Sequence, residues 1–319
     1  MFSFLEIPAD FVTYSLLKLA PDTHAAEALR FFLYDTMKVF LLLIVIIFLV
    51  TYLRSYLPRE RVRRLLAGQH RFLGHVLAAF TGIVTPFCTC SAIPLFLGFL
   101  EAGVPLGVTF TFLVASPMIN EVAIGLLLGL FGWNIVLLYV GSGLLIAIVS
   151  GLIIGSLPVN RLLTLDQSAD MSVFSGGEYK TQKDRLAFAR RVTNAIVRRV
   201  WLFVLFGISL GSLIHGFAPA NLLSDLTDKS GFLGVPIATA IGVPLYSNAA
   251  GILPLISALV EKGLPIGTAL AFMMSVTALS LPEFLILRRI MKTRLIILFA
   301  LTVSLGIIAT GYLFNAVIG

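Results

Sequence analysis

Four long apolar runs constrain the fold of this 319-residue chain more than any other feature. A helix needs about 20 mostly apolar residues to cross roughly 30 Å of hydrocarbon. Composition agrees, since 58% of the residues are hydrophobic and 12% are charged, against about a quarter charged in a soluble domain. The chain is therefore predicted to be an all-α polytopic membrane protein. The four runs cover residues 36–53, 133–157, 200–217 and 295–317.

Most basic residues gather in three clusters. Of the 23 Lys and Arg, 18 fall within residues 54–71, 161–199 and 288–294. Because cytoplasmic loops carry the excess of Lys and Arg, all three clusters are predicted to lie in the cytoplasm. Residues 158–198 then form a cytoplasmic linker between two halves of a multi-pass protein of the plasma or inner membrane. The formal charge of +7 is explained by this topology, so no nucleic-acid partner is expected.

The two halves resemble each other at a shift of 160 residues. Between Pro94 and Phe112, seven of 19 positions are identical to those 160 residues later. The shared string is Glu-x-Gly-x-Pro-x-Gly, which starts at Glu101 and at Glu261. Chance matching is the alternative, but co-registered Pro, Glu and Gly make an internal repeat the better interpretation.

Charge predicts how the two repeats are oriented. The basic loop at 54–71 corresponds to the acidic loop at 218–230, so equivalent loops lie on opposite sides of the membrane. This is an inverted-topology repeat, an arrangement that secondary transporters use to build two access states around one site. The predicted organisation is an N-terminal interfacial segment at 1–30, membrane repeat 1 at 31–157, the linker at 158–198 and membrane repeat 2 at 199–319.

The middle of each half is divided into pieces too short to span. Each piece has about 13 residues, or roughly 20 Å of helix, which is half a membrane. One pair in each half is expected to form a discontinuous span and the other a re-entrant hairpin; the sequence leaves open which is which. The pieces are residues 72–84, 91–102, 104–117 and 119–131 in the first half, and 231–243, 247–261, 264–277 and 281–292 in the second.

Two of the breaks between these pieces predict a binding site near the membrane midplane. Residues 85–94 are bracketed by Pro86 and Pro94, and residues 244–254 by Pro244 and Pro254. Non-helical backbone at this depth is tolerated only where protein or a water-filled cavity surrounds it. The predicted substrate-binding residues are Cys88, Thr89, Cys90, Ser91, Tyr246, Ser247, Asn248 and Asn120. For the polar ones, hydrogen bonding to loop backbone is the alternative role.

Both cysteines of the chain lie in the first break. Helix-break packing is one role for Cys88 and Cys90, because cysteine is a small residue that is often buried. The other is reversible binding of a soft, thiophilic centre by thiolates, favoured near helix N-termini. A Cys-x-Cys pair is too close for an easy disulfide in regular structure, and no second pair is present to relay electrons. A membrane thiol-disulfide enzyme is therefore the weaker alternative.

Glu121 and Glu283 are predicted coupling residues. Each follows a proline-containing break, after Pro117 and Pro282 respectively. A carboxylate at membrane depth costs about 2.5–3.5 kcal/mol on insertion scales, and such groups often pair, line cavities or relay protons. Their alternative role is to stabilise a helix N-terminus.

No cofactor or metal site is predicted. The four histidines have no His-x-x-His or clustered Cys/His spacing, and no phosphate-binding Gly loop is present. Energy would come from an ion gradient or from a partner subunit. No cleaved secretory leader is expected either, because the first apolar run starts late and lacks a basic segment before it.

These segments together resemble the ArsP/YraQ-like permeases, from about residue 30 to the end. The resemblance implies a permease; characterised relatives export trivalent organoarsenicals, and many members have no assigned substrate. It rests on Thr85 to Pro94 (TPFCTCSAIP), Glu101 to Gly107 (EAGVPLG), Ala115 to Glu121 (ASPMINE), Pro244 to Ala250 (PLYSNAA) and Leu279 to Glu283 (LSLPE).

The leading hypothesis is a secondary transporter. It would move a small soft, thiophilic or thiol-related solute, such as a trivalent organoarsenical, by export coupled to an ion gradient. Besides the thiol-disulfide enzyme, the alternative is a channel-like or accessory subunit of a larger permease complex. Expected partners are the solute, the lipid bilayer and either a second copy of the chain or a partner membrane subunit.

Overall fold

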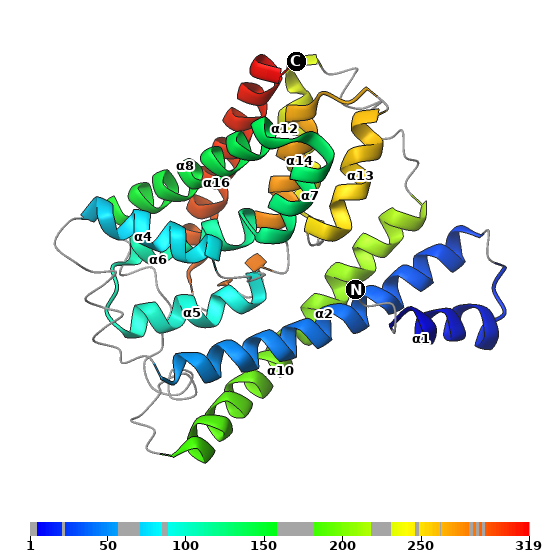
Figure 1. Ribbon diagram of the computed structural model, residues 1–319, viewed down its shortest axis with the longest axis horizontal. Coiled ribbons are helices and arrows are strands. Elements are labelled where there is room, and N and C mark those ends of the chain that lie inside the picture. The colour runs from blue at the N-terminus through cyan, green and yellow to red at the C-terminus, as the bar shows by residue number, and fades with distance from the viewer. Residues whose placement is uncertain are drawn as a thin grey trace.

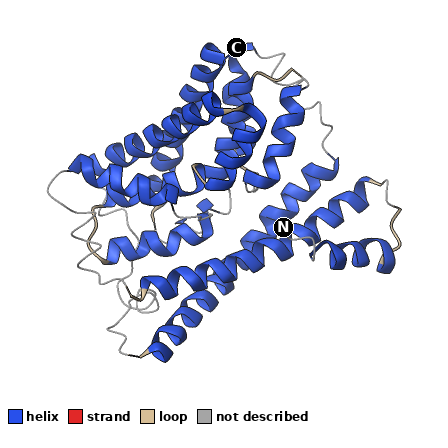
Figure 2. Ribbon diagram, in the orientation of Figure 1, coloured by secondary structure: helices blue, strands red, loops and turns tan. Residues whose placement is uncertain are grey.

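The structure is a computed structural model whose regular elements are helices (Figure 2). It describes residues 5–20, 23–56, 71–84, 89–157, 181–217, 231–245, 249–261, 263–280, 283–284, 287–288 and 291–318.

The helices of the first half match the predicted pieces. A short helix and a π-helical stretch precede the first long helix, and four helices of 11 to 14 residues lie between it and the last one. The elements are α1 (Glu6–Asp10), η2 (Phe11–Leu16), α2 (His24–Arg54), α4 (Arg71–Val84), α5 (Thr89–Glu101), α6 (Leu106–Met118), α7 (Glu121–Phe131) and α8 (Trp133–Ser156).

The second half repeats these bounds 160 residues later. Both ends of α13 and α14 coincide with those of α5 and α6 at this shift, and the first residue of α16 coincides with that of α8. The elements are α10 (Gln182–Phe217), η4 (Gly231–Leu233), α12 (Gly234–Gly242), α13 (Ala249–Glu261), α14 (Ile266–Ala278) and α16 (Thr293–Ile318). Half of the predicted piece at 281–292 lies outside the described residues.

The turns that precede α6 and α14 have the same geometry. Gly103 and Gly263 adopt φ values of +77° and +96°, which favour glycine. The next residue donates its N–H back to the preceding helix, from Val104 to Phe99 at 2.9 Å and from Leu264 to Leu259 at 3.0 Å. The shared string of the sequence repeat therefore encodes a shared turn.

Helices α2 and α10 form an antiparallel pair along one edge of the molecule (Figure 1). Ser212 of α10 donates to the carbonyl of Ala28 at 2.5 Å, near the start of α2. At the other end, Tyr52 donates to Gln182 Oε1 at 2.7 Å, and the Arg185 guanidinium lies 4.2 Å from the centre of the Tyr56 ring. Helix α10 begins at Gln182, so the end of the predicted linker is helical.

Glycines allow the central helices to pack at backbone distance. A Cβ added at Gly107 of α6 would lie 2.8 Å from Gly155 Cα of α8, while one at Gly143 of α8 would lie 2.7 Å from Ile119. Because the start of α6 lies against the end of α8 and its end lies near Gly143, the two helices run antiparallel. The corresponding Gly267 of α14 packs against Gly311 of α16 in the same way. Helices α8 and α16 cross at Ile146 and Gly306, which are themselves 160 residues apart.

Three described helices are long and apolar enough to cross a membrane: His24–Leu53, Trp133–Ser156 and Thr293–Ile318. Leu106–Met118 and Ala123–Phe131 together supply a fourth if the bent pair is one span. The predicted run at 200–217 is helical within α10 but is not among these candidates. The chain is a multi-pass membrane protein by these spans.

Candidate functional site

Helix α6 ends inside the protein, and α7 begins after two intervening residues. All of α6 is buried, including Pro117 near its C-terminal end. Asn120 is the N-cap of α7, and its Oδ1 accepts the N–H of Ala123 at 2.7 Å. The axes of the two helices differ by 48° across the break. Asn120 therefore hydrogen-bonds to backbone, which is the alternative to solute binding that its position in the sequence left open.

A tyrosine hydroxyl satisfies the C-terminal end of α6. The last four carbonyls of a helix lack intrahelical partners, so a buried helix end needs other donors. Tyr139 of α8 is fully buried and donates its hydroxyl to the carbonyl of Met118, the last residue of α6. No sequence motif marks Tyr139; the one available signal is that it is the single tyrosine of the run 133–157.

Helix α14 ends in the corresponding way but with different side chains around it. Leu279 donates its N–H to the carbonyl of Ser275 at 3.0 Å. In the first half, Ile119 donates its N–H to the carbonyl of Ala115 at 2.9 Å. The position equivalent to Tyr139 is Phe299, which cannot donate a hydrogen bond. The carbonyl of Ser280 then accepts the N–H of Glu283 at 3.0 Å.

The ends of α4 and α12 lie against these same regions. A Cβ added at Gly82 would lie 2.9 Å from Ala115 Cβ and 3.1 Å from the backbone nitrogen of Ser116. One at Gly242 would lie 3.0 Å from Ser275 Cβ. Each half-helix that leads into a predicted substrate-binding break therefore ends beside the C-terminal part of α6 or α14.

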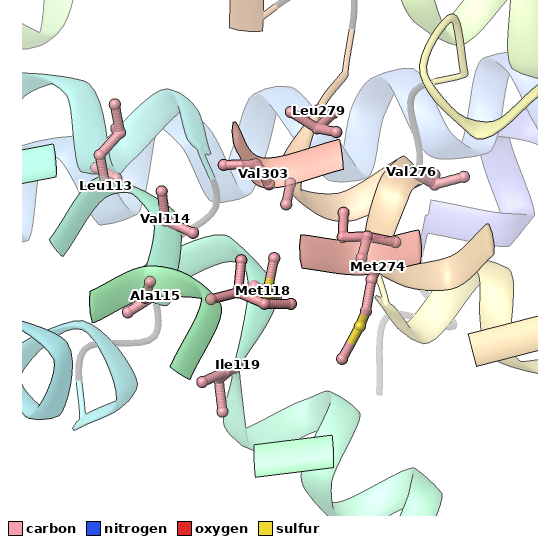
Figure 3. Packing of buried hydrophobic residues seen from close by; sticks show 14 of the residues in the cluster. Leu113, Val114, Ala115, Met118, Ile119, Met274, Val276, Leu279 and Val303 are labelled. Atoms are coloured by element: carbon pink, nitrogen blue, oxygen red, sulfur yellow. The ribbon is translucent and has the colours of Figure 1, made fainter. Parts of the chain in front are cut away.

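Buried apolar side chains fill the space between the two halves. Figure 3 shows Ala115 and Met118 of α6, the following Ile119, and Met274 of α14 within one cluster of buried side chains. Met118, Ile119 and Met274 are each 0% exposed. The two broken regions thus share one core.

Most of the predicted substrate-binding residues lie where the structure gives no side-chain position. Cys88, Tyr246, Ser247 and Asn248 are outside the described residues. Thr89, Cys90 and Ser91 form the first turn of α5, but their side chains are outside the described part. The proposed meeting of the two breaks therefore stays a prediction.

The two predicted coupling residues have contrasting environments. Glu121 is exposed at the first position of α7, as expected for a carboxylate that stabilises a helix N-terminus. Glu283 is 1% exposed, and neither of its oxygens has a hydrogen-bond partner among the described residues. At the 160-residue shift Glu283 matches Ala123 rather than Glu121.

A second buried polar contact distinguishes the first half from the second. His75 Nδ1 of α4 lies 2.7 Å from Thr111 Oγ1 of α6, and Thr111 also donates to the carbonyl of Gly107 at 3.2 Å. Since that hydroxyl proton is used, His75 Nδ1–H is the donor in the first contact. The equivalent positions are Val235 and Ala271, so sequence comparison of the halves could have marked this pair as specific to the first.

Broken helices buried in a multi-pass bundle are typical of membrane transport proteins. The family comparison agrees, since residues 24–316 match the ArsP_1 family, described as a predicted permease. The chain belongs to this family.

Named relatives cover most of the chain. UPF0718 protein MJ0584 of Methanocaldococcus jannaschii is 21% identical over 76% of this chain and 82% of its own length. A Streptococcus mutans protein named “Putative two-component membrane permease complex subunit” is 25% identical over 80% of this chain and 81% of its own length. UPF0718 protein YraQ of Escherichia coli is 24% identical over 73% and 65% respectively. No solved structure matches the chain significantly.

Proposed function

We propose that the chain is a secondary permease built from two inverted repeats. The observation that carries this proposal is that α6 and α14 end at equivalent positions beside the crossing of α8 and α16. Ile146 and Gly306, which meet at that crossing, are themselves equivalent residues. A contact between equivalent positions is expected on a two-fold axis. The pseudo-two-fold axis would then pass beside both helix breaks.

In the proposed topology, α4 and α5 form the re-entrant hairpin and α6 and α7 the broken span. His75 lies beside Thr111 and Gly82 beside Ala115, so α4 runs parallel to α6. Helix α5 must then return the chain to the start of α6, and its 13 residues cover roughly 20 Å. The 48° bend between α6 and α7 fits two pieces that continue in one direction. Helices α12 to α14 would repeat this arrangement.

The proposed cargo site lies where the two hairpin tips approach the breaks in α6 and α14. Cys88 and Cys90 would bind a soft, thiophilic or thiol-related solute as thiolates. Polar groups of the same breaks would hold the rest of the solute. These are Thr89, Ser91, Tyr246, Ser247, Asn248 and Asn120. A trivalent organoarsenical is the cargo that the family resemblance favours.

Transport would be export across the plasma or inner membrane, driven by an ion gradient through Glu121 or Glu283. Residues 158–198 would be cytoplasmic. One charge moved through 100 mV is worth about 2.3 kcal/mol, roughly a 50-fold gradient, so one coupled ion suffices for export.

A second candidate function is a membrane subunit of a two-component permease complex. The name of the Streptococcus mutans relative favours it. In that case the purified chain alone would bind cargo without transporting it.

Flux in proteoliposomes tests the proposal. Methylarsenite uptake into proteoliposomes is measured for the wild type, Cys88→Ser, Cys90→Ser and Asn248→Leu, with an imposed ion gradient. At least one cysteine variant and Asn248→Leu are expected to lose most of the flux, whereas Asn134→Leu, at an exposed position of α8, keeps it. Full flux in both cysteine variants would mean that the two cysteines only pack in the helix break. Full flux in Asn248→Leu would refute the shared site.

A further inference from the structure

The region after α14 has an excess of hydrogen-bond acceptors. Both carboxylate oxygens of Glu283 are buried without a partner among the described residues. An ionised carboxylate only accepts hydrogen bonds, and the carbonyls at a helix C-terminus do the same. Helix α14 ends at Ala278, five residues before Glu283, and its C-terminal dipole disfavours a nearby negative charge.

The first half shows what the second lacks. There, Tyr139 donates its hydroxyl to the C-terminal carbonyl of α6, and the position equivalent to Glu283 is Ala123. In the second half, Phe299 replaces the donor and Glu283 adds a further acceptor. The same helix end has therefore lost a donor and gained a charge, in a buried place where both changes cost free energy.

Described side chains around Glu283 offer no compensating positive charge. Phe284 packs its ring edge-on to Phe299, with centroids 6.3 Å apart, and Phe299 lies 5.7 Å from Phe110 of α6. Arg288, the nearest described basic residue along the chain, is exposed. A cation bound beside the carboxylate would supply the missing positive charge.

We propose that Glu283 and the C-terminal end of α14 form a binding site for a monovalent cation, with Na⁺ as the fitting ion. Carboxylate, carbonyl and hydroxyl oxygens are hard ligands, and the buried Ser280 hydroxyl adds one more. One buried carboxylate balances one monovalent charge, whereas a divalent ion would leave a net charge in a low-dielectric interior.

A metal cation and a proton would leave the oxygens of this site at different distances from one another. A protonated carboxyl group needs an acceptor within about 2.5–3.0 Å of its oxygen. A hard cation about the size of Ca²⁺ holds oxygens at about 2.3–2.6 Å from itself, so two oxygens on opposite sides of it lie beyond hydrogen-bond distance. The role of this site in coupling rests on the proposed function, but the binding of Na⁺ does not.

Thermal unfolding of the purified, cargo-free protein in detergent tests the site. Tm is measured in NaCl and in choline chloride at equal ionic strength and fixed pH. At free Na⁺ ten times the Kd, the ratio of folded to unfolded protein rises about 11-fold, which corresponds to a Tm increase on the order of 3 °C. Glu283→Gln is expected to abolish the Na⁺-dependent increase and to raise Tm in choline chloride, because it removes the unpaired charge.

Two further variants control the measurement. Glu27→Gln makes the same chemical change at an exposed position in the first turn of α2 and should keep the Na⁺ response. Ser280→Ala should raise the Na⁺ concentration needed for half of the response several-fold. No Na⁺ response in the wild type, or an unchanged response in Glu283→Gln, would overturn the cation site. A response to pH alone that Glu283→Gln removes would overturn it in favour of a proton. Because cargo is absent, failure of the cargo hypothesis leaves these outcomes unaffected.

Discussion

At the residue scale, the C-terminal ends of α6 and α14 differ because equivalent positions of the two halves hold different residues. The hydroxyl of Tyr139 closes the end of α6, and the Phe299 ring at the equivalent position of α16 packs instead against Phe284 and Phe110. Two backbones with the same bounds therefore present different chemistry at their breaks. A repeat whose halves were chemically identical would bind the same groups twice, whereas this difference would let one half bind the proposed cation.

Tyr139→Phe should destabilise the protein by about 1–3 kcal/mol, because it leaves the buried carbonyl of Met118 without its donor. The measurement is thermal or denaturant unfolding of the purified protein in detergent. Tyr312→Phe is the matched control, since the Tyr312 hydroxyl also donates to a backbone carbonyl, that of Phe232 at 2.5 Å, but in an exposed contact. Equal losses for the two variants would contradict the role assigned to Tyr139.

At the element scale, the sequence predicts the half-helices but not the contacts between them. Proline and glycine mark the ends of α5, α6, α13 and α14, so the predicted pieces agree with the observed bounds to within two residues. The start of α10 at Gln182 was not predicted, because its first turns are charged and pack on α2. Contacts such as Tyr139 to Met118 depend on which helices are antiparallel neighbours, and local pattern does not contain that information.

Gly107→Ala should lower the stability of the α6–α8 pair by about 1–3 kcal/mol, because the added Cβ would meet the backbone of Gly155 at 2.8 Å and neither helix can yield locally. Unfolding in detergent provides the measurement. Gly129→Ala in α7 is the matched control, since nothing lies within 4 Å of its added Cβ, and helix propensity alone would favour it by up to about 1 kcal/mol. If Gly107→Ala were as stable as Gly129→Ala, the close crossing would be wrong.

At the scale of the whole molecule, the α2–α10 pair lies to one side of the broken helices. Helices α2 and α10 pair along one edge, while the broken helices pack around α8 and α16 (Figure 1). The hydrogen bonds that tie α2 to α10, from Ser212 to Ala28 and from Tyr52 to Gln182, join the two halves of the chain across 184 and 130 residues. Each half therefore contributes one long helix to the edge and one set of broken helices to the centre.

The orientation of the two halves gives the last prediction. In the inverted arrangement, residue 175 in the linker is cytoplasmic and residue 225 is external, because the linker contains one of the three basic clusters and the loop at 218–230 contains Asp225 and Asp228. Ser175→Cys and Asp225→Cys are introduced separately into a variant in which both native cysteines are serine. A membrane-impermeant maleimide added to intact cells should label Asp225→Cys and should label Ser175→Cys only after permeabilisation. The cysteine-free parent measures background labelling. Finding both positions on one side would reject the inverted arrangement and, with it, the pseudo-two-fold axis that relates the end of α6 to the end of α14.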